Sequence, residues 1–319
     1  MDIGFLYHGA REALAGAKKV LIITHSKPDG DAIGASSAFV DYCLGQGIDA
    51  AIYCADPAPE QYSFLSGSER FTADRNVFAG DHDAYVILDC GGMNQTAVAD
   101  LIAARPRRTR VISMDHHLVN DIRADINIVD NKASSASEIV YRFLRDGRAE
   151  ITGDIATALL TGIYFDTIAF TNSLTGRGAL EAAADLLRLG ADVNLITERI
   201  FRSRPLNSLR LWGAAMARLK HDERLGVVST AIFMEDATAM NDKDSIDGIS
   251  NLLGSILDAQ VVMVLKEMPG GLVRGSMRAA GDRDVSAVAK ELGGGGHRKA
   301  AGFTIPGRIA ETATGWRVE

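Results

Sequence analysis

Short apolar runs alternate with longer amphipathic stretches along the first two-thirds of the chain. Residues 20–24 form a continuous apolar run, which is typical of a strand buried on both faces of a sheet. A helical pattern follows over residues 31–44, and Gly45 and Gly47 supply a stop signal. The same alternation predicts strands at 49–54, 84–88, 110–114 and 125–129 and helices at 134–144, 154–164 and 178–189. Strands that alternate with helices in this way predict an α/β fold with a doubly wound parallel sheet.

The remainder of the chain has a different pattern. Residues 192–220 look helical, and we place the junction between two domains there. Beyond the junction, the pattern predicts strands at 225–233, 260–266, 272–278 and 300–305 and helices at 246–257 and 284–292. We therefore expect three segments: a doubly wound parallel-sheet catalytic domain (1–190), a helical linker (191–220) and a smaller mixed-sheet α/β domain (221–319).

Composition narrows the class of protein. The chain has 319 residues, of which 47% are hydrophobic and 24% charged, as in ordinary globular proteins of two domains. Its net charge of −7 argues against a broad basic surface for long or duplex nucleic acid. No apolar run approaches the ~18 residues of a membrane span, and the first residues lack a signal-peptide pattern. Three cysteines without metal-site spacing (Cys43, Cys54 and Cys90) fit a reducing compartment, so we expect a cytoplasmic protein.

Acidic and histidine side chains follow the ends of the predicted strands. The run 20–24 leads into His25, Asp29 and Asp31, the run 84–88 into Asp89, and the run 110–114 into Asp115, His116 and His117. Asp166 follows the predicted helix 154–164. Ligands of open parallel sheets bind beyond the carboxyl ends of the strands. The sequence therefore predicts that these side chains meet in one crevice.

Carboxylates with a few imidazoles favour Mn²⁺ or Mg²⁺, whereas a zinc site more often recruits cysteine. The candidate ligands are too many for one ion, so two ions that share a carboxylate fit better. A pair of this kind supports an in-line displacement at phosphorus, in which a water that bridges the two ions is the nucleophile. We assign His25 and Asp29 to one ion and Asp31 to the other. Asp89 is the candidate bridge, and the second ion is completed by His116 and Asp166. Four ligand carboxylates and two divalent ions leave the crevice nearly neutral.

Each of these signals is weak when taken alone. The segment Asp29-Gly-Asp31 also fits a turn followed by a helix N-cap, and His116-His117 also fits a histidine pair in a loop. Four consecutive glycines, Gly293–Gly296, also fit a flexible linker. A helical pattern precedes them and a basic segment and a strand follow, so we favour a loop whose backbone N–H groups cradle phosphate.

The ordered segments resemble the four motifs of the DHH phosphoesterase superfamily. These segments are His25-x-x-Pro-Asp29-Gly-Asp31-Ala, the lone Asp89, Asp115-His116-His117, and Thr161-Gly-Ile-Tyr-Phe-Asp166-Thr. The C-terminal half resembles the nucleotide-recognition domain associated with that superfamily, through the segment from Asp284 to Phe303 that contains the four glycines and His297. Within the superfamily, the chain is most similar to the stand-alone nano-RNase/pAp phosphatase group.

The resemblance implies a role for each matching residue. His25, Asp29 and Asp89 resemble the ligands of the first Mn²⁺, and the second set is Asp31, Asp89, His116 and Asp166. His117 is similar to the family's substrate-facing histidine, with Asp115 orienting its neighbours. The positions that hold the nucleotide match Arg278, His297 and the backbone of Gly294, Gly295 and Gly296.

One segment departs from the family pattern. Ile168 stands where family members often have glycine after the last aspartate and threonine, and the loop that follows looks shorter. We expect this departure to affect the rim of the site and the substrate preference more than the chemistry.

The leading hypothesis is a phosphoesterase with two divalent ions, Mn²⁺ or else Mg²⁺. The resemblance implies that it hydrolyses short oligoribonucleotides, 3′-phosphoadenosine 5′-phosphate (pAp), or both, with the second domain closing over the nucleotide. The alternatives are a phosphodiesterase for linear or cyclic dinucleotides, an exopolyphosphatase or pyrophosphatase, and a catalytically inactive nucleotide sensor or RNA-binding module. We expect no membrane partner, and a homodimer is compatible with the sequence, which locates no interface.

Overall fold

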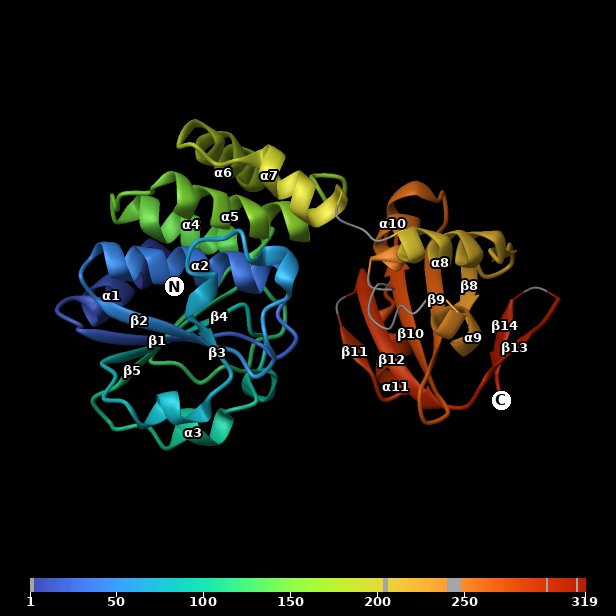
Figure 1. Ribbon diagram of the computed structural model, residues 1–319, viewed down its shortest axis with the longest axis horizontal. Helices are drawn as coiled ribbons and strands as arrows, with labels where there is room; N and C mark the ends of the chain where they lie inside the picture. Colours follow the sequence, from blue (N-terminus) through green and yellow to red (C-terminus); the bar gives the residue numbers. More distant parts are fainter. Residues whose placement is uncertain (1–2, 203–205, 240–247, 297, 314) are drawn as a thin grey trace. The chain divides into compact units, whose positions relative to one another are not determined.

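The computed structural model describes residues 3–202, 206–239, 248–296, 298–313 and 315–319. The chain divides into two compact units, Met1–Ser203 and Arg204–Glu319, each with its own buried hydrophobic clusters (Figure 1). This division lies inside the segment that the sequence assigns to a helical linker, and the outer limits of that linker stay a prediction. Among the described residues, no helix is long and apolar enough to cross a membrane.

The first unit is built on a parallel sheet with the order β3-β2-β1-β4-β5-β6. Its strands are β1 (Lys19–Ile23), β2 (Asp49–Tyr53), β3 (Phe71–Thr72), β4 (Ala84–Leu88), β5 (Arg110–Asp115) and β6 (Ile126–Val129). The chain runs outward from β1 to β3 and then returns to the middle of the sheet at β4. The strand order therefore reverses between β1 and β4, and crevices at such switch points are where open α/β sheets bind ligands.

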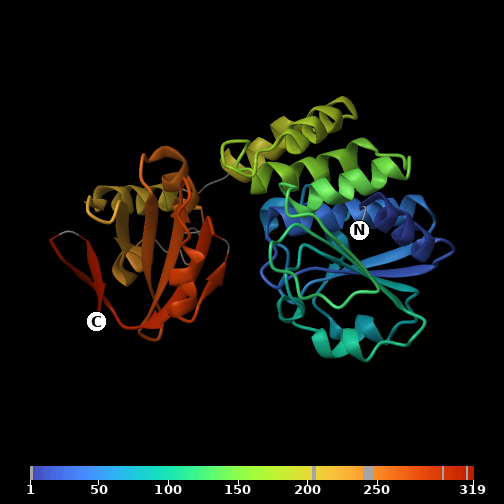
Figure 2. The same ribbon diagram turned by 180° about the vertical axis from the view of Figure 1, so that it is seen from behind.

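Helices cover both faces of this sheet, as the predicted doubly wound fold requires. Figures 1 and 2 show α1, α2, α4 and α5 on one face and α3 on the other. The helices are α1 (Ile3–Leu14), α2 (Gly30–Gly45), α3 (Ala99–Ala103), α4 (Ala136–Asp146) and α5 (Gly153–Asp166), with α6 (Arg177–Arg188) and α7 (Val193–Thr197) packed against α5. Single-turn helices are η1 (Glu60–Tyr62), η2 (Ser68–Arg70), η3 (Arg75–Ala79), η4 (Met93–Thr96) and the π-helical η5 (Glu198–Arg202).

The buried strand β1 shows why the run 20–24 is apolar throughout. Val20 and Ile22 belong to the cluster beneath α1, α2, α4 and α5, whereas Leu21 and Ile23 belong to the cluster on the α3 face. All four side chains are completely buried. A central strand of a two-faced sheet therefore needs apolar side chains at consecutive positions rather than at every second one.

The second unit has a mixed sheet with the order β11-β12-β10-β9-β8-β7, in which only β8 and β9 pair in parallel. The strands of this sheet are β7 (Lys220–Asp222), β8 (Val227–Ile232), β9 (Val261–Met268), β10 (Leu272–Ala279), β11 (Gly295–Gly296) and β12 (Ala300–Pro306). A separate two-stranded sheet is formed by β13 (Ile309–Glu311) and β14 (Trp316–Val318). The helices of the second unit are α8 (Leu206–Ala217), α9 (Met234–Ala239), α10 (Ile249–Ile256) and α11 (Ser286–Glu291). The predicted fold class is confirmed, although the pattern missed the short strands β3, β7, β11, β13 and β14 and the helices α1, α3 and α9.

Candidate metal centre

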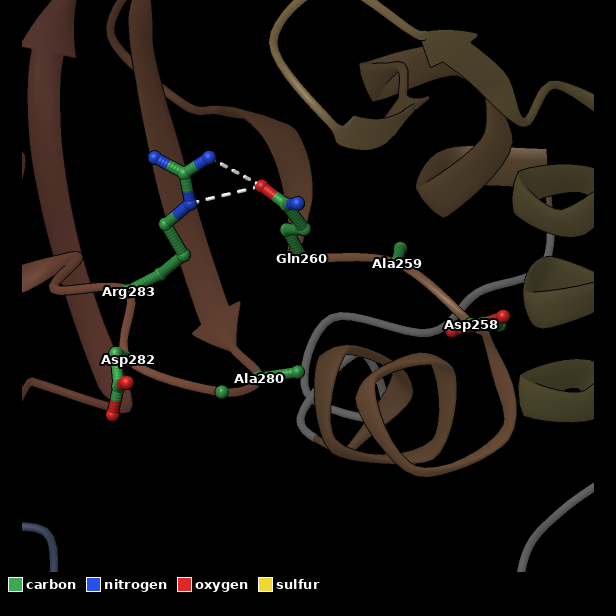
Figure 3. A pocket seen from close by; sticks show the side chains of 7 residues that line it. Asp258, Ala259, Gln260, Ala280, Asp282 and Arg283 are labelled. Carbon is green, nitrogen blue, oxygen red and sulfur yellow. Dashed lines mark hydrogen bonds between the residues drawn. The ribbon is translucent and has the colours of Figure 1, made fainter.

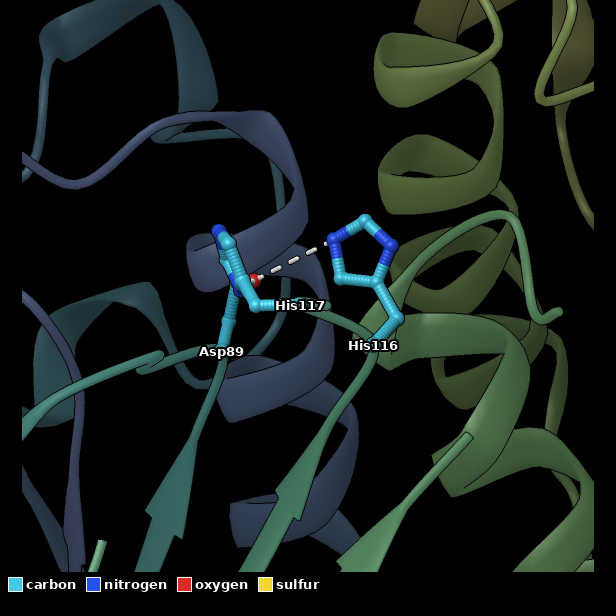
Figure 4. A group of neighbouring side chains, drawn as sticks. All are labelled: Asp89, His116 and His117. Atoms are coloured by element: carbon cyan, nitrogen blue, oxygen red, sulfur yellow. Dashed lines mark ion pairs between the residues drawn. The ribbon is translucent and has the colours of Figure 1, made fainter. Parts of the chain in front are cut away.

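The carboxyl edge of the first sheet gathers the predicted ligands. His25 follows β1, Asp89 follows β4, His116 follows β5, and Asp166 is the last residue of α5. Figure 4 shows Asp89 beside His116 and His117 at neighbouring strand ends. Three groups of side chains have ligand atoms within 4.8 Å of one another: His25, Asp29 and Asp89; Asp31, His116 and Asp166; and Asp89, His116 and His117.

Asp89 lies between two of these groups. Its Oδ2 is 3.4 Å from His25 Nε2, and its Oδ1 is 3.7 Å from His116 Nε2. The residue is only 3% exposed, yet Oδ1 accepts no hydrogen bond from the described part of the chain. Its φ of 57° is in the left-handed region, which is costly for a residue with a Cβ and is concentrated at functional sites. This geometry leaves a buried carboxylate oxygen directed at a place where a cation would satisfy it.

Asp29 and Asp31 are each fixed by a helix N-terminus. Asp29 caps α2, because its Oδ1 accepts hydrogen bonds from the backbone N–H groups of Asp31 (3.0 Å) and Ala32 (3.2 Å). The carboxylate of Asp31 instead reaches the start of α4, where it accepts from Ala136 N (2.6 Å) and Ser137 N (2.9 Å). The turn-and-cap interpretation of Asp29 is therefore correct, and it is compatible with a ligand role because a carboxylate has several lone-pair sites.

The start of α4 differs from the capping box that Ser135 and Glu138 would form. Ser135 Oγ accepts from Glu138 N (3.0 Å), as in such a box. The Glu138 carboxylate, however, accepts from the N–H and hydroxyl of Ser134 (both 2.7 Å), which precedes the N-cap. Because Glu138 is 1% exposed, these bonds compensate for its burial and hold the end of α4 that carries the N–H groups for Asp31.

Two glycines allow α5 to approach the site closely. A Cβ on Gly162 would overlap Ser137 Oγ and lie 2.5 Å from Asp31 Oδ1. A Cβ on Gly34 of α2 would lie 2.5 Å from the carbonyl oxygen of Ala158 on α5. Gly162 lies within the motif that ends at Asp166, but the motif alone assigns it no role, because its importance depends on packing between residues far apart in the chain.

Asp115, which belongs to none of the three ligand groups, pairs with His117, which belongs to one of them. Asp115 is completely buried, and its Oδ1 lies 2.6 Å from His117 Nδ1. Its Oδ2 accepts a hydrogen bond of 2.8 Å from Asn120 Nδ2. The carboxylate of Asp115 can only accept here, so the proton lies on His117 Nδ1 and the ring presents Nε2 on its other side. The pattern assigns no role to Asn120, although this polar residue directly follows the apolar pair Leu118-Val119 after the Asp-His-His segment.

Crowding of carboxylates dominates the electrostatics of the site. Burial, followed by the charge of neighbouring carboxylates, raises the pKa of Asp29 and raises the pKa values of Asp31 and Asp166 well above the ordinary value. Burial opposes the charged form of His25, but the hydrogen bond and charge of Asp89 outweigh it and raise the pKa of His25 to about 10. The same histidine bond and charge overcome burial and hold the pKa of Asp89 below its ordinary value. Divalent cations would offset the negative charge of these crowded carboxylates.

The turn after Asp166 places Ile168 in a backbone conformation that favours glycine. Residues 168, 169 and 170 have φ values of 49°, 55° and 64° and form a left-handed turn directly after α5. Glycine adopts this conformation without strain, whereas a β-branched residue does not. The turn is tied back to the site by Asn172 Nδ2, which donates a hydrogen bond of 2.6 Å to the backbone oxygen of Asp166.

The predicted nucleotide contacts lie in the second unit. Arg278 on β10 donates from Nε to Asn251 Oδ1 (2.5 Å) and from Nη1 to the Met277 backbone oxygen (2.8 Å). The glycine run is not a loop throughout, because Gly295 and Gly296 form the edge strand β11 against β12. A Cβ on Gly294 would overlap the backbone of Gly302, so close strand contact explains part of this run. His297 lies outside the described residues.

A hollow of about 450 Å³ lies in the second unit between residues 258–260 and 280–283 (Figure 3). Arg283 Nε donates a hydrogen bond of 2.9 Å to Gln260 Oε1 on its wall. The described residues that line it do not include Arg278 or the glycines of β11, and the two carboxylates of Asp258 and Asp282 would disfavour a phosphate. We therefore do not assign the hollow to the nucleotide.

Comparison with known proteins connects both units to described families. Residues 19–163 match the family model of the DHH family N-terminal domain, and residues 227–314 match that of the DHHA1 domain. The chain is 32% identical to the bifunctional oligoribonuclease and PAP phosphatase NrnA of Thermus thermophilus, across 90% of this chain and 84% of that protein. It is 25% identical to the cyclic-di-AMP phosphodiesterase GdpP of Geobacillus thermodenitrificans, across 91% of this chain and 45% of that protein.

A solved structure is similar over nearly the whole length. An exopolyphosphatase-related protein from Bacteroides fragilis matches with a TM-score of 0.87 and 25% identity, covering 94% of this chain and 90% of that one. The fold, the order of the motifs and these relatives agree with one another. The chain therefore belongs to the DHH family and is a phosphoesterase composed of a DHH domain and a DHHA1 domain.

Proposed function

We propose that this phosphoesterase uses two divalent metal ions, Mn²⁺ or else Mg²⁺, to hydrolyse short oligoribonucleotides, pAp, or both. The observation that carries the proposal is the position of Asp89 between two groups of ligands. His25 and Asp29 lie on the side of its Oδ2, and His116, which contacts Asp166, lies on the side of its Oδ1. One carboxylate within reach of both groups is the arrangement that a pair of metal ions requires.

The residues present fit such ions. The donor set is made of carboxylate oxygens and imidazole nitrogens, which suits Mn²⁺ and Mg²⁺. The buried Asp89 Oδ1 accepts no hydrogen bond within the described chain, and the pKa values of Asp29, Asp31 and Asp166 are raised through burial and mutual repulsion. We propose His25, Asp29 and Asp89 as ligands of one ion and Asp31, Asp89, His116 and Asp166 as ligands of the other. The ions, when bound, supply Lewis-acid activation of the attacking water and neutralise charge on the phosphate.

The chain's own groups perform the remaining tasks. The bond between His117 Nδ1 and Asp115 Oδ1 fixes the ring so that Nε2 is the nitrogen that contacts the phosphate or donates a proton to the leaving oxygen. Burial disfavours the charged imidazole, but the hydrogen bond to Asp115 and the charge of Asp89 outweigh it and raise the pKa of His117 to about 9. The protonated ring is the form that can donate a proton to a leaving group.

The substrate class rests on the relatives and on the second unit. NrnA of Thermus thermophilus is named an oligoribonuclease and PAP phosphatase, and most of both chains is covered by the match. We propose Arg278, His297 and the backbone of Gly294, Gly295 and Gly296 as contacts to the nucleotide. The free, buried cysteines Cys43, Cys54 and Cys90 support a reducing compartment, and we propose the cytoplasm.

A hydrolysis panel tests the proposal. The substrates are pAp, a 5′-phosphorylated RNA dinucleotide, an RNA 5-mer and 24-mer, cyclic di-AMP and pyrophosphate, each with Mn²⁺, with Mg²⁺ and with a chelator. We expect metal-dependent loss of the dinucleotide, pAp, or both, while the 24-mer is largely spared and the Asp115→Ala/His116→Ala double variant is inactive. Preferential hydrolysis of cyclic di-AMP, pyrophosphate or the 24-mer would contradict the substrate class, and hydrolysis that survives the chelator would contradict the metal dependence.

A further inference from the structure

The side chain of Asn120 connects the carboxyl ends of β4 and β5 to the neighbouring strand β6. Its Nδ2 donates to Asp115 Oδ2 (2.8 Å) at the end of β5 and to the backbone oxygen of Cys90 (3.1 Å), the residue after Asp89. Its Oδ1 accepts from Ile122 N and from Asn127 Nδ2 on β6, both at 3.1 Å. An asparagine amide offers two donors and two acceptor sites, so the hydrogen-bonding capacity of Asn120 is fully used.

The orientation of this amide is determined by its neighbours. The backbone N–H of Ile122 can only donate, so the oxygen of Asn120 must face it and the NH₂ group must face Asp115. The NH₂ group then holds Asp115 Oδ2, while the other oxygen of the same carboxylate receives His117 Nδ1 at 2.6 Å. Asp115 is completely buried, so these donors compensate for the burial of its charge.

The segment that follows His117 is exposed, so the hydrogen bonds of Asn120 are needed to hold it against the site. Leu118 and Val119, which separate His117 from Asn120, are 64% and 73% exposed. Asn120 returns the chain to the site directly after this exposed pair. A histidine that must present one nitrogen to a substrate loses rate when its ring is displaced, because near-attack geometry tolerates little error.

We infer that Asn120 is a positioning residue, which holds the Asp115 carboxylate so that it orients the His117 ring toward the scissile phosphate. The inference rests on the proposed function, in which His117 contacts the substrate. Asn120 acts through Asp115 and does not itself touch the substrate.

Asn120→Asp is the sharpest test, because it keeps the size of the side chain and replaces the donor to Asp115 with a carboxylate oxygen. We expect kcat for the preferred substrate of the panel to fall about 10- to 100-fold, with KM little changed, since substitution of outer partners of metal-site groups commonly has this effect. Asn76→Asp, at an exposed asparagine of η3, adds the same charge and is the matched control. Asn127→Ala removes a contact to Asn120 while leaving the bond to Asp115 and is expected to lower kcat much less.

A second readout does not depend on turnover. The proton in the short Asp115–His117 bond should give a far-downfield proton resonance in the Mg²⁺-loaded full-length protein, assigned by its loss in His117→Gln. We expect the resonance to disappear or move upfield in Asn120→Asp and to persist in Asn76→Asp and Asn127→Ala. An unchanged resonance with unchanged kcat in Asn120→Asp, or an equal loss in Asn127→Ala, would overturn the inference. If no substrate in the panel is hydrolysed, the proposed function fails, whereas the resonance still decides whether Asn120 positions the pair.

Discussion

Several single residues of the candidate metal centre are held by contacts other than those a metal ion would make. Asp29 and Asp31 accept backbone N–H groups at two helix starts, and Asp115 is held by His117 and Asn120. Asp89 is the exception, because its Oδ1 accepts no hydrogen bond in the described chain. A substitution of Asp89 therefore distinguishes a residue that binds metal from one that only supports the local structure.

Asp89→Asn removes one negative charge without changing the size of the side chain. We expect kcat/KM for the preferred substrate to fall by at least about 10²-fold, because one carboxylate serves both ligand groups. Steady-state kinetics across a range of Mn²⁺ concentrations checks this, with Asp100→Asn on the exposed surface of α3 as the charge-matched control. Retention of activity within tenfold of the parent at saturating Mn²⁺ would refute the shared role.

A buried histidine far from the site gives a pH-dependent prediction. His82 is 2% exposed, its Nε2 contacts no polar partner in the described chain, and burial lowers its pKa. The unfolded chain therefore takes up a proton at a higher pH than the folded chain. The free energy of unfolding should be independent of this group above about pH 7 and should decrease as the pH falls below about 6.5.

Thermal unfolding between pH 5 and pH 7.5 measures this effect. In His82→Gln the acid-dependent loss of melting temperature should be smaller than in the parent, whatever the change in stability at neutral pH. His221→Gln, at an exposed histidine of β7, should keep the parent's pH dependence. Parallel pH curves for the parent and His82→Gln would show that His82 does not contribute.

At the scale of elements, the site depends on how closely α2, α4 and α5 approach one another. The N-terminus of α4 supplies two N–H groups to Asp31, which belongs to the first turn of α2. Gly162 on α5 provides the space in which Asp31 and Ser137 meet. The three helices thus share one contact region beside the ligands.

Gly162→Ala introduces a methyl group into that region. We expect the free energy of unfolding to fall by about 1–3 kcal/mol, as for other overpacked cores, and kcat to fall because Asp31 is displaced. Gly213→Ala is the matched control, since this glycine lies on the exposed side of α8 and an added Cβ meets nothing within 4 Å. That substitution should leave activity unchanged and stabilise the protein by about 0.5–1 kcal/mol. Chemical denaturation of both variants gives the comparison, and equal stability changes would contradict the packing argument.

At the scale of the whole molecule, the predicted ligands lie in the first unit, and each unit has its own hydrophobic clusters. Crowded carboxylates in the absence of metal oppose folding of the first unit, because burial and mutual repulsion raise the pKa values of Asp31 and Asp166. Metal binding should therefore stabilise that unit and leave the other unaffected.

Calorimetry with and without Mn²⁺ tests this expectation. A free Mn²⁺ concentration of 100 times the dissociation constant should stabilise the first unit by about 2.7 kcal/mol for each ion bound, and a chelator should reverse the shift. The unfolding transition of the first unit should move to a higher temperature with Mn²⁺, whereas that of the second unit should stay where it is. Asp166→Asn should weaken the Mn²⁺ response, and an undiminished response in this variant would contradict its place among the ligands.

The sequence by itself determined the order of most of the longer elements and the residue types that meet at the strand ends. Buried parallel strands leave a local signal in continuous apolar runs, so the expected limits of the strand at 84–88 and the helix at 154–164 lie within two residues of β4 and α5. Chain direction then brings all carboxyl ends of parallel strands to one edge. The first inference depends on neighbouring residues only, and the second follows from the common direction of the strands, so neither needed the packing of individual side chains.

Only the tertiary structure decided which side chains and backbone groups contact one another at the site. Asp31 meets the start of α4 across 105 positions of sequence, and Gly162 is required only because Asp31 and Ser137 lie against it. Asn120 gains its role from its contacts with Cys90 and Asn127. The glycines of β11 gain theirs from pairing with β12. Such contacts depend on how distant elements pack, which residue periodicity does not encode, so the sequence supplied the chemistry of the site and the fold supplied its geometry.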